Sequence, residues 1–305
     1  MRKTLAIVLL LLSCATIQAQ HWLGVSVDAD MAWQLDKIDI TKAKIGGGGS
    51  FGAVYQFQYN HFILETGVSG SYILNNVGVK DSLLHFEMVD TKGTQFTYNG
   101  YLKDRIDASK NLFVNIPLML GTEFDYFYAL VGAKVSLNLL TQTLQKALLS
   151  TTGDYDMYYE PLMDMPNHGF HDFEKEQTTG SMKYKMLDLR VAAEIGTLFY
   201  SSNRSAKYRI GVFAEYGVLN VRNQATGHSL LVPDLSEYMH VQMNHIYSTS
   251  YNLASPVNNI FCGIRFTALF SVGDIKGTRS NYSTHKRKLS PASSRRSYPC
   301  RCLLY

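Results

Sequence analysis

Two long runs of alternating residues, joined by a very short turn at Asp125, occupy residues 111–139. In each run the apolar side chains fall on every second position, with glycine and polar residues between them. This period of two is that of a β-strand. Each run continues for about a dozen residues, whereas strands in soluble domains average about 5 or 6 residues and membrane-crossing strands need roughly 9 to 11. The hairpin therefore predicts two strands of a membrane-spanning barrel.

The same alternation recurs along the rest of the chain and predicts eight strands in all. They are expected at residues 21–34, 50–59, 62–74, 111–124, 127–139, 187–199, 208–218 and 260–271. No segment outside the N-terminus approaches the run of about 18 apolar residues that a transmembrane helix needs. Hydrophobic residues still make up 46% of the chain. Without a transmembrane helix, we expect them on one face of alternating strands.

The connections between these strands are alternately long and short. Long loops are expected at residues 36–49, 75–110, 140–183 and 221–257, and short turns at 60–61, 125–126 and 201–207. An even number of strands, with short turns on the periplasmic side and long loops outside, is typical of outer-membrane barrels. We therefore predict an all-β fold, an eight-stranded antiparallel up-and-down transmembrane β-barrel with long extracellular loops. It is expected in the outer membrane of a Gram-negative bacterium, with both termini periplasmic.

The N-terminus carries the features of a secretory signal. Arg2 and Lys3 precede an apolar run at residues 5–12 and a small-residue exit near Ala19. We predict that residues 1–19 are a signal peptide and that residues 20–275 form the barrel. The alternative is lipoprotein processing, because residues 11–14 resemble a lipoprotein box and would leave a lipidated Cys14.

Charged residues of the strands lie on the positions opposite to the apolar ones. They are Asp28, Glu65, Lys134, Arg190, Glu194, Arg209, Glu215 and Arg265. An eight-stranded barrel is only wide enough for side chains to fill its interior, so we predict a salt-bridged, plugged lumen without an open pore. Counting from the turns places Arg265 between Glu215 and Asp28, and Lys134 beside Glu194. A catalytic use of these carboxylates is the alternative, but buried charges usually pair for structure.

Aromatic residues gather at the predicted periplasmic ends of the strands, on the apolar positions. They are Tyr59, Phe62, Phe124, Phe127, Phe199, Tyr208 and Phe270. Amphipathic rings are enriched where lipid headgroups begin, which predicts an interface girdle. A soluble barrel of lipocalin type is the alternative fold. It would have to expose bands of Leu, Ile, Val and Phe to water or to enclose the strand charges in a ligand cavity.

A family resemblance rests on two features of the central hairpin. The segment Ile-Pro-Leu at residues 116–118 and the sequence FYALVGAK at residues 127–134 resemble the porin-like outer-membrane β-barrel family of Bacteroidetes, often called PorT-like. The resemblance covers roughly residues 21–272. It implies an eight-stranded outer-membrane barrel. It does not imply a demonstrated porin, and membership is not proof of the secretion role suggested for PorT. The chain departs from the usual ending of such barrels because it continues past Phe270.

Catalytic and metal-binding signatures are weak. The sequence holds no G-x-S-x-G, Walker-type or HExxH motif. His168, His171 and Asp172 in one expected loop, and His240 and His245 in another, do not form a closed metal-ligand set. We therefore predict no enzyme activity, no cofactor and no metal site.

The C-terminal segment, residues 276–305, differs in composition from the barrel. It contains eight Lys and Arg residues and no acid, and such a Ser-rich basic segment is expected to be a disordered periplasmic tail that could contact anionic headgroups or peptidoglycan. Without the signal and this tail the chain has 19 basic and 25 acidic residues. Binding to nucleic acid is not expected in that compartment, and Cys300 and Cys302 remain an unexplained exposed pair.

Three functional classes follow. The first is a structural or surface-interaction barrel that contacts outer-membrane lipid and, through its long loops, extracellular protein partners, since loops on a rigid scaffold commonly carry recognition. The second is a component of the outer-membrane secretion machinery. The third is an outer-membrane enzyme or small-solute porin. The first is the prediction, and the sequence does not identify a ligand, an oligomeric state or a specific role.

Overall fold

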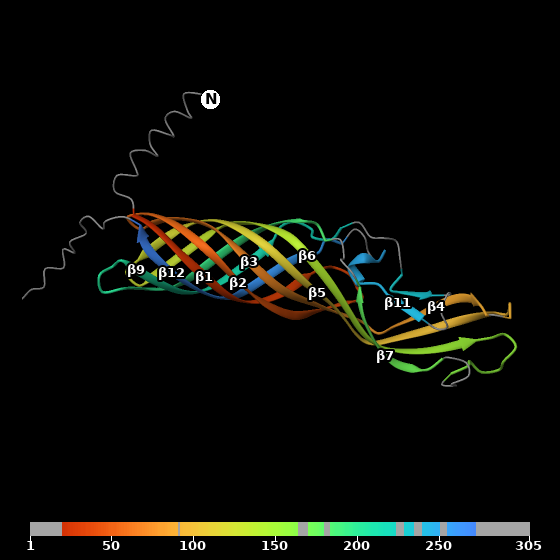
Figure 1. The fold of residues 1–305 in the computed structure, drawn as a ribbon. Coiled ribbons are helices and arrows are strands. Elements are labelled where there is room, and N and C mark those ends of the chain that lie inside the picture. Colours follow the sequence, from red (N-terminus) through yellow and green to blue (C-terminus); the bar gives the residue numbers. More distant parts are fainter. Residues whose placement is uncertain are drawn as a thin grey trace, which may run out of the picture. The chain divides into compact units, whose positions relative to one another are not determined.

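The computed structural model describes residues 20–90, 92–163, 170–179, 184–223, 229–234, 240–250 and 255–272 (Figure 1). The predicted signal peptide and Cys14, the basic tail with Cys300 and Cys302, and His168 lie outside the described residues. Among the residues that are described, no helix is long and apolar enough to cross a membrane.

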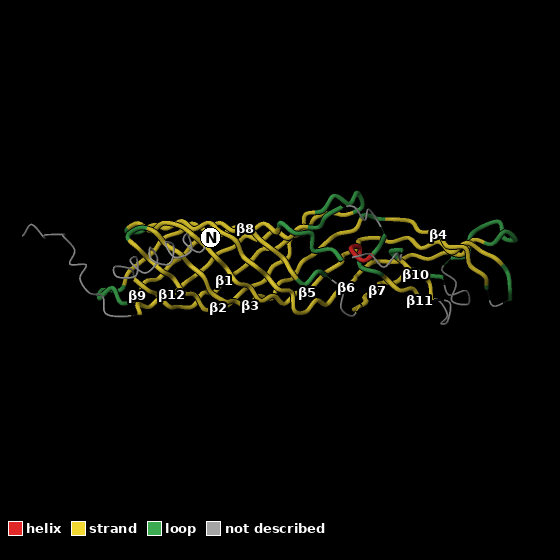
Figure 2. The backbone as a smooth tube through the Cα atoms, turned by 90° about the horizontal axis from the view of Figure 1, so that it is seen from above, coloured by secondary structure: helices red, strands yellow, loops and turns green. Residues whose placement is uncertain are grey.

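Eight strands close into an antiparallel ring. They are β1 (Gln20–Leu35), β2 (Thr41–Tyr59), β3 (Phe62–Val79), β5 (Gln95–Phe124), β6 (Phe127–Asp154), β8 (Leu187–Tyr200), β9 (Ala206–Gly217) and β12 (Asn258–Val272). Each pairs with its neighbour in the chain order of the ring, and β12 pairs with β1 to close it. In Figure 2 the strands of the near and far walls cross one another obliquely, as expected for the tilted strands of a barrel. The predicted fold class, an eight-stranded up-and-down barrel, is confirmed.

The apolar positions of the ring point outward. Leu23, Val68, Val131, Ile210 and Ile264 are examples from five strands whose side chains are about half exposed or more. The intervening positions are buried inside the ring and include most of the strand charges. This is the reverse of a soluble barrel, whose apolar side chains face the interior, and it excludes the lipocalin-type arrangement.

Beyond the ring, the long connections form a second structure, which we call the head. It consists of residues 95–107 of β5 and 143–154 of β6, together with β4 (Ser82–Val89), β7 (Asp172–Thr179), β10 (Leu231–Asp234), β11 (His240–Met243), the 3-10 turn η1 (Ile246–Ser248) and the described connections between these elements. β4 pairs with β5 and β7 pairs with β6, which makes a four-stranded antiparallel sheet β4-β5-β6-β7. The expectation of irregular loops at 75–110 and 140–183 was therefore wrong for much of both segments.

Two bulges explain why the head strands do not continue the alternation of the barrel. In the β5–β6 ladder, Asp104 and Arg105 bulge in β5, and Leu139 bulges in β6. An extra residue moves all following side chains to the other face of the sheet. Even positions of β6 are therefore exposed after Leu139, whereas odd positions are exposed before it. The change of phase interrupts the period of two and makes a continuous strand resemble a loop.

The strand β2 also begins earlier than expected. It starts at Thr41 and includes Gly46–Gly49, which pair with Ala32–Ala29 of β1. The register to β3 shifts between Lys44 and Gly47, and a Cβ atom on Gly46 would lie 1.9 Å from the carbonyl oxygen of Leu74. The glycines therefore allow a close approach of two backbones at a bulge.

Candidate functional site

Hydrogen bonds and ion pairs run through the interior of the ring, which we call the lumen. At the end where the short turns lie, the turn end, Lys207 Nζ contacts Glu123 Oε2 at 2.7 Å and Gln58 Oε1 at 2.9 Å. The hydroxyl of Tyr200 donates a hydrogen bond to the same glutamate. The ammonium of Lys207 also lies 4.6 Å from the centre of the Trp22 ring, close enough for a cation–π contact.

One step further into the lumen, Arg209 pairs with Glu65, with 2.5 Å between Nη2 and Oε2. Its guanidinium also lies 4.8 Å from the centre of the Tyr128 ring. The hydroxyl of Tyr128 donates to Glu194 Oε1 at 2.7 Å. The side chain of Tyr128 thereby connects the Arg209–Glu65 pair to Glu194, which belongs to the next ion pair in the lumen.

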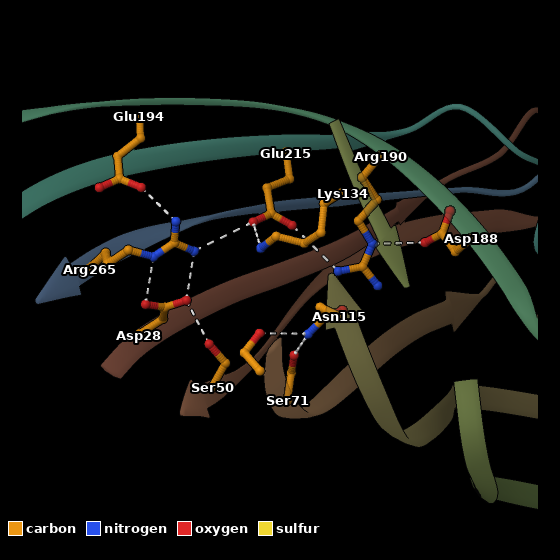
Figure 3. A network of polar contacts seen from close by, with 11 residues as sticks. Asp28, Ser50, Ser71, Asn115, Lys134, Asp188, Arg190, Glu194, Glu215 and Arg265 are labelled. Atoms are coloured by element: carbon orange, nitrogen blue, oxygen red, sulfur yellow. Dashed lines mark hydrogen bonds and ion pairs between the residues drawn. The ribbon is translucent and has the colours of Figure 1, made fainter. Parts of the chain in front are cut away.

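The centre of the lumen is organised by Arg265 (Figure 3). Its guanidinium binds Asp28 through two nitrogens at 2.8 and 2.7 Å, and Nη1 lies 2.5 Å from Glu194 Oε2. A third carboxylate, Glu215, lies 3.8 Å from Nη2. Such bidentate contacts are the strongest geometry that arginine offers to a carboxylate.

Glu215 continues the network toward the head. It accepts a hydrogen bond from Lys134 Nζ and lies 3.5 Å from Nη1 of Arg190. Arg190 Nε then contacts Asp188 Oδ2 at 2.9 Å. Figure 3 shows these side chains pointing toward one another from different strands of the ring. The chain of contacts thus extends from the turn end to the head end of the barrel.

The structure places all eight predicted lumen charges inside the ring, each no more than 9% exposed. The contact of Arg265 with Asp28 follows the expected pairing, because these residues are direct partners in the β1–β12 ladder. The expected contact of Lys134 with Glu194 is replaced by its contact with Glu215. The turn-end aromatics are not level with each other, since Phe127 pairs with Thr197 and not with Phe199. Glu194 consequently faces Leu130, four residues from Lys134.

Sequence reasoning missed three members of the network. Glu123 and Asp188 lie on the inward positions of two expected strands but are not among the eight predicted lumen charges, and Lys207 lies in an expected turn. The signal was present, because Lys207 lies two residues before Arg209 and therefore on the same face of a strand. The strand β9 (Ala206–Gly217) begins two residues earlier than expected, so Lys207 belongs to the strand and is fully buried instead of lying in a surface turn.

Apolar side chains fill the lumen between the charges. The three buried clusters are Trp22, Val54 and Leu269; Ile63, Met119, Tyr128, Leu130, Ala192 and Leu198; and Ala32, Ile73, Phe113, Phe213 and Phe261. The guanidinium of Arg190 lies 4.1 Å from the centre of the Phe261 ring, and that of Arg265 lies 4.8 Å from Phe213. The interior is therefore packed with alternating charges and rings.

The predicted girdle residues are exposed on the outside of the ring at its turn end. Tyr59 pairs with Phe62, Phe124 with Phe127, and Phe199 with Tyr208 across the three turns, and Phe270 pairs with Leu23. All seven aromatics of the predicted girdle are at least 39% exposed. These aromatics share one end of the ring, and their place at a lipid interface stays a prediction.

The head has a hydrophobic core of its own. Its buried members come from segments far apart in the sequence: Ile38, Val77, Val79, Phe96, Tyr98, Leu102, Ala147, Leu149, Phe170, Val221, Leu230, Leu231, Val241, Met243, Ile246, Tyr247 and Val257. This cluster is the largest of the four apolar clusters in the described residues. The head is consequently a folded structure rather than a set of independent loops.

A segment that we call the lid, residues 229–234 and 240–250, is fastened to the head sheet by buried charges. Arg105 forms a two-point contact with Asp107 at 2.8 and 2.9 Å and donates to the carbonyl of Leu230 at 3.3 Å and to that of Asn244. Asp107 in turn accepts a hydrogen bond at 2.7 Å from the amide of Ile246. The bulge at Asp104 and Arg105 thus turns the arginine toward the lid.

His245 lies at the start of η1, and its ring Nδ1 accepts a hydrogen bond from the amide of Tyr247 at 3.2 Å. Burial lowers the pKa of His245 from its usual value of 6.5 to about 4; the carboxylate of Asp107 opposes this change and the guanidinium of Arg105 adds to it. The imidazole is therefore neutral at neutral pH. Within the part of the chain that the structure describes, no group of three His, Cys, Asp or Glu residues could hold a metal ion.

A small polar cavity lies between the lumen and the head, lined in part by Gln34, Asn111, Tyr184, Asp188 and Asn259. It has room for about one water molecule. It is too small for an organic ligand, so it does not define a substrate site.

Together, the closed ring of eight strands, the apolar outer band and the charged lumen define an eight-stranded β-barrel of the inside-out type that membrane barrels have. The sequence matches no protein-family model and no curated protein. Similar solved structures include the following two. Ail, the attachment invasion locus protein of Yersinia pestis, crystallised with the heparin analogue sucrose octasulfate, is 11% identical; the match has a TM-score of 0.23 and covers 81% of this chain and 99% of Ail.

The deltaS2 mutant of the monoaromatic hydrocarbon channel TodX is 10% identical, with a TM-score of 0.17 and coverage of 84% of this chain and 92% of TodX. At these scores neither similarity contributes to the functional assignment. The fold is established by the strand pairing itself.

Replacing Arg265 by Met should destabilise the barrel strongly, because Asp28 and Glu194 would lose their shared cation in a buried site. Removing one partner of a buried ion pair typically costs about 3–5 kcal/mol. The measurement is equilibrium unfolding in urea of the refolded barrel. The matched control is Arg204→Met at an exposed turn position, for which a change within about 0.5 kcal/mol is expected. Equal stability of the two variants would contradict a structural role for the lumen network.

The lid should open more readily as the pH falls from about 6.5 to about 4. The unfolded lid binds a proton on His245 in this range and the closed lid does not, so closure loses up to about 3 kcal/mol and the loss ends near pH 4. Hydrogen exchange of amides 240–250, corrected for intrinsic rates, measures the opening. His245→Asn keeps an acceptor for the Tyr247 amide and should remove the pH dependence in this window. An unchanged pH profile in that variant would show that another group is responsible.

Proposed function

We propose that this chain is a non-enzymatic integral outer-membrane β-barrel whose filled lumen anchors a folded extracellular head, and that the head acts in surface interactions. The observation that carries the proposal is the separate core of the head. Residues from segments far apart in the sequence pack there under a lid held by Arg105 and Asp107. A folded head presents a fixed surface, which independent loops do not.

Membrane placement is supported by the outside of the ring. A band of Leu, Val, Ile and Phe side chains covers it, and the predicted girdle of aromatics lies at the turn end. Exposing this surface to water would cost about 25 cal/mol for each Å² of apolar area. Lipid removes that cost, and closure of the ring through β1 and β12 leaves no edge without backbone partners inside the bilayer. The turn end would face the periplasm, as short turns do in outer-membrane barrels.

The packed lumen supports an anchoring role rather than transport. Each charge in the centre has an oppositely charged partner within 4 Å, and rings occupy the space between the pairs. Moving a solute through this interior would break several buried pairs at once. We therefore propose a barrel that does not conduct.

Spin labels test the placement in lipid. Labels at Val131 and Ile264, both 58% exposed on the outside of the ring, should collide with lipid-soluble oxygen and be shielded from an aqueous nickel chelate. A label at the exposed head residue Met157 should show the opposite preference. If Val131 and Ile264 proved open to the aqueous quencher, the outer-membrane assignment would fail.

Site-specific photo-crosslinking tests the role of the head. A benzophenone side chain at the fully exposed head residue Tyr159 should give protein adducts on intact cells, whereas the same group at Tyr126, an exposed residue of a short turn, should not give those adducts. Cells that lack the protein should secrete their exported proteins normally. Loss of secretion, or adducts only from Tyr126, would instead favour a component of the secretion machinery.

A further inference from the structure

The two edges of the head sheet differ in chemistry. β7, with the sequence DFEKEQTT, carries four charged residues, which is a common way to prevent an edge strand from pairing with another chain. β4, with the sequence SLLHFEMV, carries one acid and one histidine, no proline and no lysine. Among the described residues β4 pairs only with β5. Its other edge is eight residues long and lacks most of the protective devices of edge strands.

The side chains of β4 alternate between two faces. Leu84, Phe86 and Met88 pack against the head core. His85 and Glu87 lie on the opposite face, where His85 Nδ1 is 2.6 Å from Asn99 Oδ1 and Thr97 donates to Glu87 at 3.2 Å. Both are placed by contacts with β5, so their positions along the edge are fixed.

The sequence of β4 is complementary to itself in one antiparallel register. When Phe86 lies opposite the Phe86 of a second copy, His85 faces Glu87 twice, once on each side of the centre. The remaining pairs are Leu84 with Met88 and Leu83 with Val89, so every apolar residue faces an apolar one. Such cross-strand pairs, aromatic, aliphatic or oppositely charged, are the unit of sheet stabilisation. Moving one strand by one residue would place core-facing residues opposite outward-facing ones, for example Leu84 opposite Glu87.

We propose that β4 is a homophilic docking edge, at which the β4 of a second copy of this chain adds in antiparallel orientation to continue the head sheet. The interface is isologous, because the same strand contributes both sides. Main-chain hydrogen bonds supply the affinity and the His85–Glu87 pairs set the register, as in strand addition generally. An unrelated extended peptide could use the same backbone groups, but the double complementarity of charge and size favours the second copy.

The direction of the strands decides where that second copy lies. β5 and β6 run without a break from the turn end of the barrel into the head, and β4 is antiparallel to β5. Figures 1 and 2 show the head strands continuing along the direction of the barrel. Antiparallel addition reverses this direction, so the barrel of the second copy must point the opposite way. All copies in one membrane share one orientation, and the proposed pairing therefore joins two facing membranes. This inference rests on the proposed placement of the barrel in a membrane with the head outside.

Cysteine cross-linking tests the pairing and its direction. In a chain with Cys262, Cys300 and Cys302 replaced by Ser, one population carries His85→Cys and another carries Glu87→Cys, each with a different affinity tag. Opposed positions in an antiparallel pair have Cβ atoms about 4.5–5.5 Å apart, within reach of oxidation or of a short thiol cross-linker. Reconstituted in separate liposomes and then mixed, the two variants should form a dimer that carries both tags. Glu174→Cys and Glu176→Cys on β7 are the matched control and should not cross-link.

The outcomes separate the two levels of the inference. Mixed in detergent micelles, the His85→Cys and Glu87→Cys variants test the edge pairing without a membrane, and the absence of a mixed dimer there would overturn it. A mixed dimer that forms in micelles and when both variants share one liposome, but not between separate liposomes, would overturn the pairing of facing membranes. A chain that never enters liposomes would contradict the proposed function instead.

A charge exchange gives a second readout that a merely structural role of these residues would not produce. His85→Glu alone places two glutamates opposite each other, and Glu87→Lys alone places lysine opposite histidine. Each single variant should weaken liposome clustering on the order of tenfold. The double variant restores opposite charges at both contacts and should recover clustering. Clustering that is unaffected by the single variants, or not recovered by the double variant, would contradict the proposed register.

Discussion

The whole structure depends on pairing charges inside a ring from which water is largely displaced. Each ion that leaves water costs several kcal/mol even after relaxation, and only close partners with good hydrogen-bond geometry recover that cost. Arg265 meets this condition by binding Asp28 through two nitrogens and Glu194 through a third. Because its partners come from β1 and β8, the contact connects walls of the barrel that are not neighbours in the ring. The network therefore contributes to a single arrangement of the strands as well as to the filling of the lumen.

The head applies the same principle at a smaller scale. Arg105 and Asp107 are buried beside each other and use their remaining hydrogen-bonding capacity on backbone groups of the lid. A lid made of short strands and one 3-10 turn has little regular structure of its own to hold it in place. Its closure therefore depends on these two side chains, on Tyr247 donating to Asp36 at 2.6 Å, and on burial of its apolar residues against the head sheet.

The barrel could be predicted from the sequence because its rule is local. One face of each strand meets an apolar surrounding and the other meets the lumen, so the period of two is visible in every strand. The head followed no such local rule, because the bulges at Asp104 and Leu139 change the phase within single strands. Its core also joins residues as distant as Ile38 and Val257, and nothing in either segment alone indicates the contact. Predicting the pairing of Lys134 with Glu215 would have required the stagger between neighbouring strands, and counting residues from the turns does not give that stagger.

Continuous strands also give the molecule a mechanical property. β5 has 30 residues and β6 has 28, and their ladder extends from the turn at Asp125 to the pair Thr97–Asp154 in the head. Inter-strand hydrogen bonds lie perpendicular to the strands, so a pull on the head along the strand direction loads many of them in shear at the same time. A head joined by a thin linker would instead transmit the load through one covalent segment. The two long strands thus form a stiff tether, in which tension applied outside is distributed over the wall of the barrel.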